Sequence, residues 1–140
     1  EEKARAAGIR GKLFTLLAEK KEVVVDGKKV KYDEVTYLQE GKKIVYSGDT
    51  TPCASVVEHA KQVELLVHES TFGNDQEETA KEKKHSTAQQ AAQTAKKAKA
   101  KKLLLIHFSN RYEDRNVLLQ EAQKTFPETV LAQEGMEIEI

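Results

Sequence analysis

Residues 63–71 read VELLVHEST, an apolar run followed directly by polar side chains. The same arrangement recurs as KIVYSGDT at residues 43–50 and as LLLIHFS at residues 103–109. Apolar runs that alternate with helical patterns predict strands joined by right-handed crossovers, and therefore a largely parallel sheet. In an open α/β sheet, ligands bind beyond the carboxyl ends of the strands. A carboxylate and imidazoles delivered to that edge indicate a metal-assisted active site, or part of one.

Size and composition set the class of protein. We expect the 140 residues to form one domain, with 39% hydrophobic and 33% charged residues. The net charge of zero gives no global attraction to nucleic acid, so contact with a polyanion requires a local patch. The longest apolar run has four residues, which is too short to span a bilayer. The single cysteine, Cys53, excludes an intramolecular disulfide and favours a reducing, cytoplasmic setting.

The first 41 residues differ in pattern from the rest, and we expect them to form a lead-in of short helices and hairpins. Residues 1–7 and 11–19 have helical character, and Asp26-Gly27 between apolar runs predicts a type I′ hairpin turn. A second hairpin is expected from residues 34–38, through a turn at Glu40-Gly41, to residues 42–47.

Residues 42–140 predict a β/α core. The expected elements are a helix from Thr51-Pro52 to about Lys61, a strand over 63–67, a loop over 73–84, a helix with a capping box formed by Ser86 and Gln89, a strand over 102–106, a helix capped by Asp114 that packs Val117, Leu118 and Ala122, and closing strands over 128–132 and 136–140 about a turn at Glu134-Gly135.

Several of the polar residues after the strands can be interpreted in more than one way. Asp49 is either a partner of the following helix dipole or a metal ligand, and His107 is either a hydrogen-bonded strand-end histidine or a ligand. The pair His68-Glu69 suits proton transfer or the orientation of a ligand. His85 precedes a capped helix, where backbone N–H groups favour a phosphate. Two residues, Ser109 and Arg111, are natural additional phosphate contacts.

The ordered set of motifs resembles the C-terminal part of ribonuclease Z, the tRNA 3′-processing endonuclease of the metallo-β-lactamase fold. The matching stretches are YSGDTTP at 46–52, LVHESTF at 66–72, HSTA at 85–88, IHFSNRY at 106–112 and LAQEGM at 131–136, with GIRG at 8–11 and VDGKKV at 25–30 upstream. The resemblance covers nearly the whole chain. It implies half of an αββα sandwich, with a mixed sheet that carries helices on one face and hairpins at the N-terminus.

The resemblance also implies roles for particular residues. Asp49 is expected to bridge two zinc ions, and His107 to be a terminal ligand of one of them. Glu69 and His85 are expected to form the proton-relay and phosphate-binding pair, with His68 adjacent. The remaining two, Ser109 and Arg111, are expected near phosphate at the substrate end of the site. The expected substrate is the 3′ end of a tRNA precursor, and no membrane partner is expected.

The chain departs from the family pattern in one large respect. It has four histidines, and none is spaced as in the family's His-x-His-x-Asp-His cluster. The arm with which family members grip tRNA is not evident either. Asp49 and His107 alone make two ligands, whereas zinc requires three or four from protein. We therefore expect weak activity or none from this half alone, and a partner in the form of a second copy or a complementary N-terminal half.

Two rival interpretations stay open. The chain could be a non-catalytic, engineered or truncated half-domain that forms a metal-binding homodimer. It could also be a small phosphate-binding module without metal that uses His85, Ser109 and Arg111.

Overall fold

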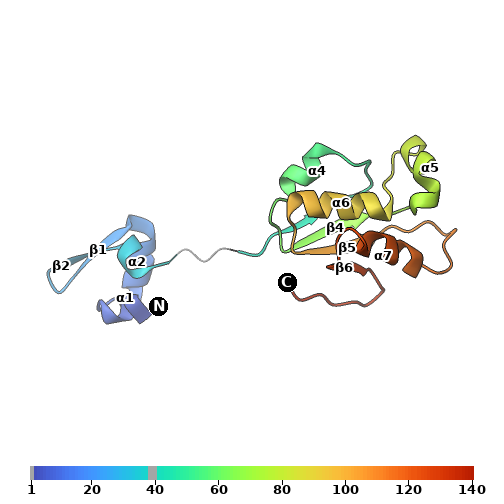
Figure 1. The fold of residues 1–140 in the computed structure, drawn as a ribbon. Coiled ribbons are helices and arrows are strands. Elements are labelled where there is room, and N and C mark those ends of the chain that lie inside the picture. Colours follow the sequence, from blue (N-terminus) through green and yellow to red (C-terminus); the bar gives the residue numbers. More distant parts are fainter. Residues whose placement is uncertain (1, 38–40) are drawn as a thin grey trace. The chain divides into compact units, whose positions relative to one another are not determined.

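The structure is a computed structural model that describes residues 2–37 and 41–140. The chain divides into two compact units, Glu1–Gly41 and Lys42–Ile140 (Figure 1). The elements of the first unit are α1 (Glu2–Ala6), α2 (Lys12–Lys20), β1 (Glu22–Val25), β2 (Lys28–Lys31) and α3 (Tyr32–Val35). Those of the second are β3 (Ile44–Tyr46), α4 (Ala54–His59), β4 (Leu65–Glu69), η1 (Asn74–Gln76), α5 (Glu77–Glu82), α6 (Ala88–Ala98), β5 (Lys102–Ile106), α7 (Asn116–Gln123) and β6 (Thr129–Leu131).

The first unit is built around one hairpin. Strands β1 and β2 pair antiparallel, and the turn residues Asp26 and Gly27 have φ angles of 48° and 77°. Positive φ at both central residues is what a type I′ turn requires, so the predicted hairpin is confirmed. The hairpin and its helices enclose a small apolar cluster of Ala4, Ile9, Leu17, Val23, Val30 and Val35.

The prediction of a second hairpin was wrong. Residues Tyr32–Val35 form the single helical turn α3, because the Glu34 carboxylate accepts a hydrogen bond from the Lys31 amide at 3.1 Å and closes the turn. Residues 38–40, where the predicted strand ended and its turn began, lie outside the described residues. Strand β3 pairs parallel with β4 instead.

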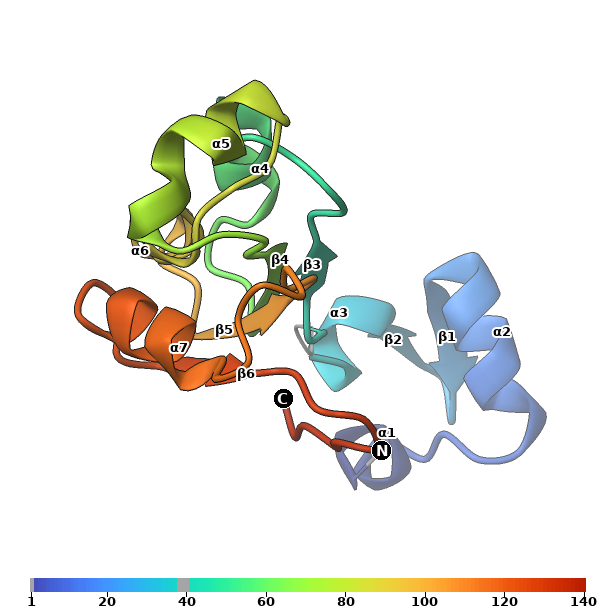
Figure 2. The ribbon, with the colours of Figure 1, turned by 90° about the vertical axis from the view of Figure 1, so that its right-hand side faces the viewer.

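The second unit contains a parallel sheet with the strand order β3-β4-β5-β6. Helix α6 packs on β4 and β5, and α4 and α7 flank it on the same face of the sheet (Figures 1 and 2). With the antiparallel hairpin of the first unit, the chain shows the predicted combination of mixed sheets and helices on one face. The domain prediction is not tested by this division and stays a prediction.

The apolar core lies between the sheet and these helices. Leu66, Leu103, Leu105 and Leu118 are fully buried there, together with the alanine stripe Ala88, Ala91, Ala92, Ala95 and Ala98 of α6. Small side chains let α6 approach the sheet closely. Val117, which we expected to pack, is 47% exposed. The opposite face of β3 presents Ile44 and Tyr46, which are 54% and 67% exposed.

Two element boundaries differ from the prediction. Ser86 does not cap α6, because its hydroxyl donates to the Thr50 carbonyl at 2.7 Å. Thr87 is the N-cap, and its capping box with Gln90 is complete. Helix α4 begins at Ala54, after Cys53 rather than Thr51.

Two further predicted segments were wrong. Residues 73–84 are not a loop but contain η1 and α5, which is anchored by the fully buried Ala80. Residues 136–140 form no strand, although the turn at Glu134-Gly135 is present. Within residues 2–37 and 41–140, none of the helices combines the length and apolar character needed to cross a bilayer.

Candidate metal centre

The polar residues after β3, β4 and β5 meet at one edge of the sheet. The three strands are parallel neighbours, so their carboxyl ends face the same way. Asp49 follows β3 after Gly48, whose φ of 62° turns the chain. His107 follows β5 directly and has a φ of 54°. For a residue with a Cβ atom, this left-handed backbone conformation costs about 1–2 kcal/mol of free energy. Such conformations are concentrated at functional sites.

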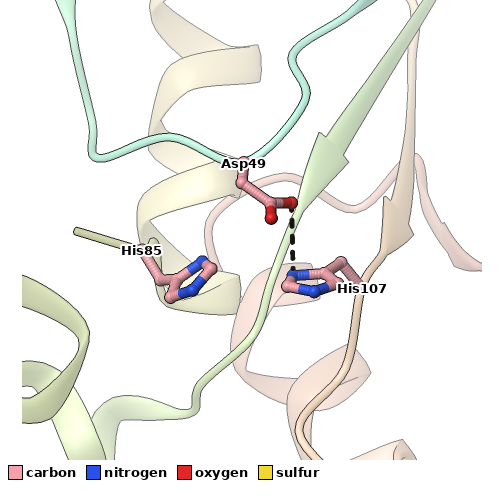
Figure 3. A group of neighbouring side chains, drawn as sticks. All are labelled: Asp49, His85 and His107. Carbon is pink, nitrogen blue, oxygen red and sulfur yellow. Dashed lines mark ion pairs between the residues drawn. The ribbon is translucent and has the colours of Figure 1, made fainter. Parts of the chain in front are cut away.

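Asp49, His85 and His107 form a cluster (Figure 3). Each offers one ligand atom, and these three atoms lie within 4.8 Å of one another. Asp49 Oδ1 lies 3.4 Å from His107 Nδ1, and the two imidazole centroids are 5.3 Å apart. The side chains of Asp49 and His107 are 61% and 46% exposed, so the cluster opens to solvent. The sequence had paired Asp49 with His107 but had not placed His85 among the ligands.

A fully buried carboxylate, Glu69, supports this cluster from within the protein. One oxygen accepts hydrogen bonds from the Thr50 amide and from His85 Nδ1, both at 2.9 Å. The other accepts from the Thr71 hydroxyl at 2.7 Å and the Thr71 amide at 3.2 Å. Burial by itself raises the pKa of Glu69, but the hydrogen bonds from Thr71, Thr50, Ser86 and His85 outweigh it and hold the pKa below its usual value. The carboxylate is therefore a fixed acceptor.

His85 belongs to the open cluster and also contacts this buried carboxylate. It lies in the segment between α5 and α6, and its amide donates to the Ala80 carbonyl at 2.8 Å. With Nδ1 directed at Glu69, the second ring nitrogen, Nε2, is free for another partner. In the neutral ring Nε2 carries a lone pair that suits a metal ion, and in the protonated ring it carries a hydrogen that can be donated to a phosphate oxygen.

Ser109 and Arg111 lie beside the cluster. The Ser109 amide donates to the Thr71 carbonyl at 3.0 Å. Arg111 donates to Gln76 Oε1 at 2.6 Å and lies over the Phe72 ring, 5.2 Å from its centroid. The same ring meets His85 edge-on, with 6.1 Å between the centroids. The guanidinium is thus exposed next to the site and held by neighbours on η1.

His68 lies apart from the metal-binding cluster. Successive strand residues point to opposite faces, so His68 turns away from Glu69. Its Nδ1 donates to the Glu69 carbonyl at 2.7 Å, and its buried Nε2 has no hydrogen-bond partner among residues 2–37 and 41–140. Burial lowers the pKa of His68 against the opposing effect of Glu69, so the neutral imidazole is favoured. Its contact with the site is through the backbone of Glu69.

Sequence reasoning missed Thr71 and Thr50, both of which hold the Glu69 carboxylate. Thr71 stood in the same polar stretch as His68 and Glu69 and followed the strand directly, which was the available signal. The contact from Thr50 crosses from the loop after β3 to β4, and no local pattern indicates it.

The donor set fits a divalent metal ion. Two imidazole nitrogens and one carboxylate oxygen are ligands that Zn, Mn and Fe accept. Catalytic zinc sites keep three protein ligands and an open position, and this cluster is open to solvent on one side. The buried Glu69 carboxylate, which accepts from Nδ1 of His85, orients this ring, so that the other nitrogen is available either to a metal ion or for proton transfer.

Comparisons with known proteins identify the family to which the chain belongs. Residues 16–108 match the model of the beta-lactamase superfamily domain. Ribonuclease Z of Brevibacillus brevis is 46% identical over 144 residues, which cover 94% of this chain and 44% of that protein. Ribonuclease Z of Ignicoccus hospitalis is 42% identical over 127 residues, which cover 91% of this chain and 42% of that protein. The chain spans less than half the length of these relatives.

Solved structures also include homologues with the same fold. The crystal structure of the short form of human tRNase Z matches with a TM-score of 0.57 and 34% identity, over 80% of this chain and 36% of that one. The metallo-β-lactamase fold protein YhfI from Bacillus subtilis matches with a TM-score of 0.63 and 28% identity, over 68% of this chain and 39% of that one. The chain therefore belongs to the beta-lactamase superfamily, has the metallo-β-lactamase fold, and is a homologue of ribonuclease Z over most of its length.

Proposed function

We propose that this chain carries one half of the active site of a zinc-dependent phosphodiesterase that processes the 3′ end of tRNA precursors. The observation that carries the proposal is the cluster of Asp49, His85 and His107, with ligand atoms within 4.8 Å, in a chain homologous to ribonuclease Z. The relatives carry the name of a ribonuclease, and the cluster offers part of the ligand set that metal-assisted phosphodiester hydrolysis uses.

Each residue has a distinct part in the proposed reaction. Asp49 and His107 would hold the metal, which would lower the pKa of a bound water and stabilise negative charge on the phosphate. Glu69 fixes His85 through Nδ1, so that Nε2 faces the cluster and can hold or release a proton next to the scissile bond. In this scheme Ser109 and Arg111 bind a neighbouring phosphate, and His68 holds the backbone of Glu69.

The proposed site requires more ligands than this cluster contains. The metal-binding histidine cluster of the family is not in these 140 residues, and the chain spans less than half of its relatives. We propose that a complementary N-terminal half or a second copy of the chain supplies the remainder. The exposed side chains of Ile44 and Tyr46, on the sheet face opposite α6, are the proposed surface for such a partner.

Metal content and hydrolysis test the proposal together. Zinc per chain is measured by mass spectrometry after dialysis, and activity is measured on bis-p-nitrophenyl phosphate and on a tRNA precursor with a 3′ trailer. Asp49→Ala and His107→Ala are expected to abolish zinc retention and whatever hydrolysis the wild-type chain shows. The control is His59→Ala, because His59 is an exposed histidine on α4 whose ring contacts only the Ser55 carbonyl among the described residues. Activity that survives both ligand substitutions would sink the proposal.

The rival proposal is a non-catalytic homodimer that binds metal structurally. The exposed apolar residues of β3 favour it, because a sheet face in water is stabilised by pairing. Sedimentation at micromolar concentration distinguishes the two: a monomer excludes the homodimer, whereas a dimer with bound zinc and no hydrolysis supports it. Phosphate binding without any metal would instead favour a simple phosphate-binding module.

A further inference from the structure

One hydroxyl group, that of Thr71, contacts three functional side chains at once. Its oxygen lies 2.7 Å from Glu69 Oε2, 2.9 Å from His107 Nδ1 and 3.2 Å from His85 Nδ1. Thr71 is 7% exposed, so water does not compete freely for these contacts. The hydroxyl therefore joins the buried carboxylate to both imidazoles of the cluster.

The number of available protons determines which side chain donates each of these hydrogen bonds and which side chain accepts it. A hydroxyl has one proton to donate, and an ionised carboxylate can only accept. Glu69 already accepts N–H groups at both oxygens, so the proton of Thr71 is directed at Oε2, its closest partner. The Thr71 oxygen is then left to accept hydrogen bonds from the imidazoles.

This assignment decides the tautomer of His107. Its Nδ1 faces two oxygens, that of Thr71 at 2.9 Å and Asp49 Oδ1 at 3.4 Å, and both act as acceptors. Nδ1 must therefore carry the hydrogen. The lone pair of the neutral ring then lies on Nε2, which is the nitrogen left free for a cation.

We propose that Thr71 is a positioning residue that fixes the Nδ1–H tautomer and the ring orientation of His107, so that Nε2 is presented to a divalent cation. The inference rests on the proposed metal site for its purpose, whereas its geometry rests on the distances from the Thr71 hydroxyl to Glu69 and the two imidazoles. Groups that orient a metal-ligating histidine in this way typically contribute a factor of about 10–100 in metal affinity.

Two substitutions separate the hydroxyl from the rest of Thr71. Thr71→Val keeps the branched shape and the backbone bond from the Ser109 amide, but removes the hydroxyl. Thr71→Ser keeps the hydroxyl and loses only a methyl group. Thr94→Val is the matched control, because Thr94 is also buried, at 4% exposure, and its hydroxyl donates within α6 to the Gln90 carbonyl.

The first measurement is the imidazole tautomer in the metal-free 140-residue chain, read from long-range ¹H–¹⁵N spectra at about pH 8, where free histidine is neutral. We expect His107 as the Nδ1–H form in the wild type, Thr71→Ser and Thr94→Val, and a mixture of forms in Thr71→Val. An Nε2–H form in the wild type would overturn the inference, and this outcome does not depend on the folding of any variant. An unchanged tautomer in Thr71→Val would also overturn it.

The second measurement is zinc affinity by competition with a chromogenic chelator. We expect Thr71→Val to bind zinc about 10–100-fold more weakly and Thr71→Ser to restore binding. Equal affinity of Thr71→Val and wild type would overturn the role of Thr71. If no chain binds zinc, the proposed function fails, whereas the tautomer measurement still decides for or against the present inference.

Discussion

The core under the helices and the inner layer of the edge at the carboxyl ends of the strands are both buried, but they are stabilised differently. Leu66, Leu103 and Leu118 are fully buried among apolar neighbours. At the edge, Glu69 and Ser86 are equally buried, and each is held by directed hydrogen bonds. The stabilisation gained by burying an apolar side chain depends on the area and volume that it fills. A buried polar group is stable only when all of its hydrogen-bonding partners are present. A change in volume should therefore damage the core, and a change in donors or acceptors should damage the edge.

The largest effect is expected from a volume change in the core. Leu118→Ala should lower the free energy of unfolding by about 2–5 kcal/mol, because it removes methyl groups and leaves a cavity between α7 and α6. Its neighbour is the control: Val117 is 47% exposed, and Val117→Ala should change stability by no more than about 0.5 kcal/mol. Urea denaturation of both variants measures the difference. Similar losses for the two would contradict the placement of the core.

A smaller effect is expected from changing the acceptor at the edge. Glu69→Gln keeps the volume but puts an NH₂ group opposite N–H and O–H donors, and should cost about 1–3 kcal/mol in the free energy of unfolding. Asp49→Asn is the matched control, since its side chain is 61% exposed, and should cost about 0.5 kcal/mol or less while weakening metal binding. Denaturation at neutral pH compares the two. A more damaging Asp49→Asn would reverse the roles of these carboxylates.

The third prediction concerns His68, a polar side chain at the boundary of the two regions. Burial lowers its pKa in the folded protein, so the unfolded chain binds more protons as the pH falls below about 6.5. The free energy of unfolding should therefore decrease with falling pH from that value down to the folded pKa. His68→Asn retains a donor for the Glu69 carbonyl without a titratable ring, and should make this decrease less steep. Denaturation series between about pH 5 and pH 8 measure the slopes. An identical slope in variant and wild type would show that another group is responsible.

Much of the fold could be predicted because it depends on local patterns. The Asp26-Gly27 turn, the strand over residues 102–106 and the alanine stripe of α6 follow from turn chemistry and periodicity. Local patterns failed where a distant contact decides. Ser86 looks like a cap in the sequence, but its hydroxyl bonds to Thr50, 36 residues earlier, and the cap moves to Thr87.

For the site, the residues at the strand ends could be read from the sequence, and parallel pairing brings Asp49, Glu69 and His107 to one edge. The approach of His85 to Asp49 and His107, and the link from the Thr71 hydroxyl to Glu69, appear only in the folded chain. The physical reason is that strand order sets positions to within a few ångströms, whereas hydrogen bonds and metal ligation depend on tenths of an ångström. Those distances are set by side chains that approach each other from different loops. No periodic pattern in the sequence predicts such contacts.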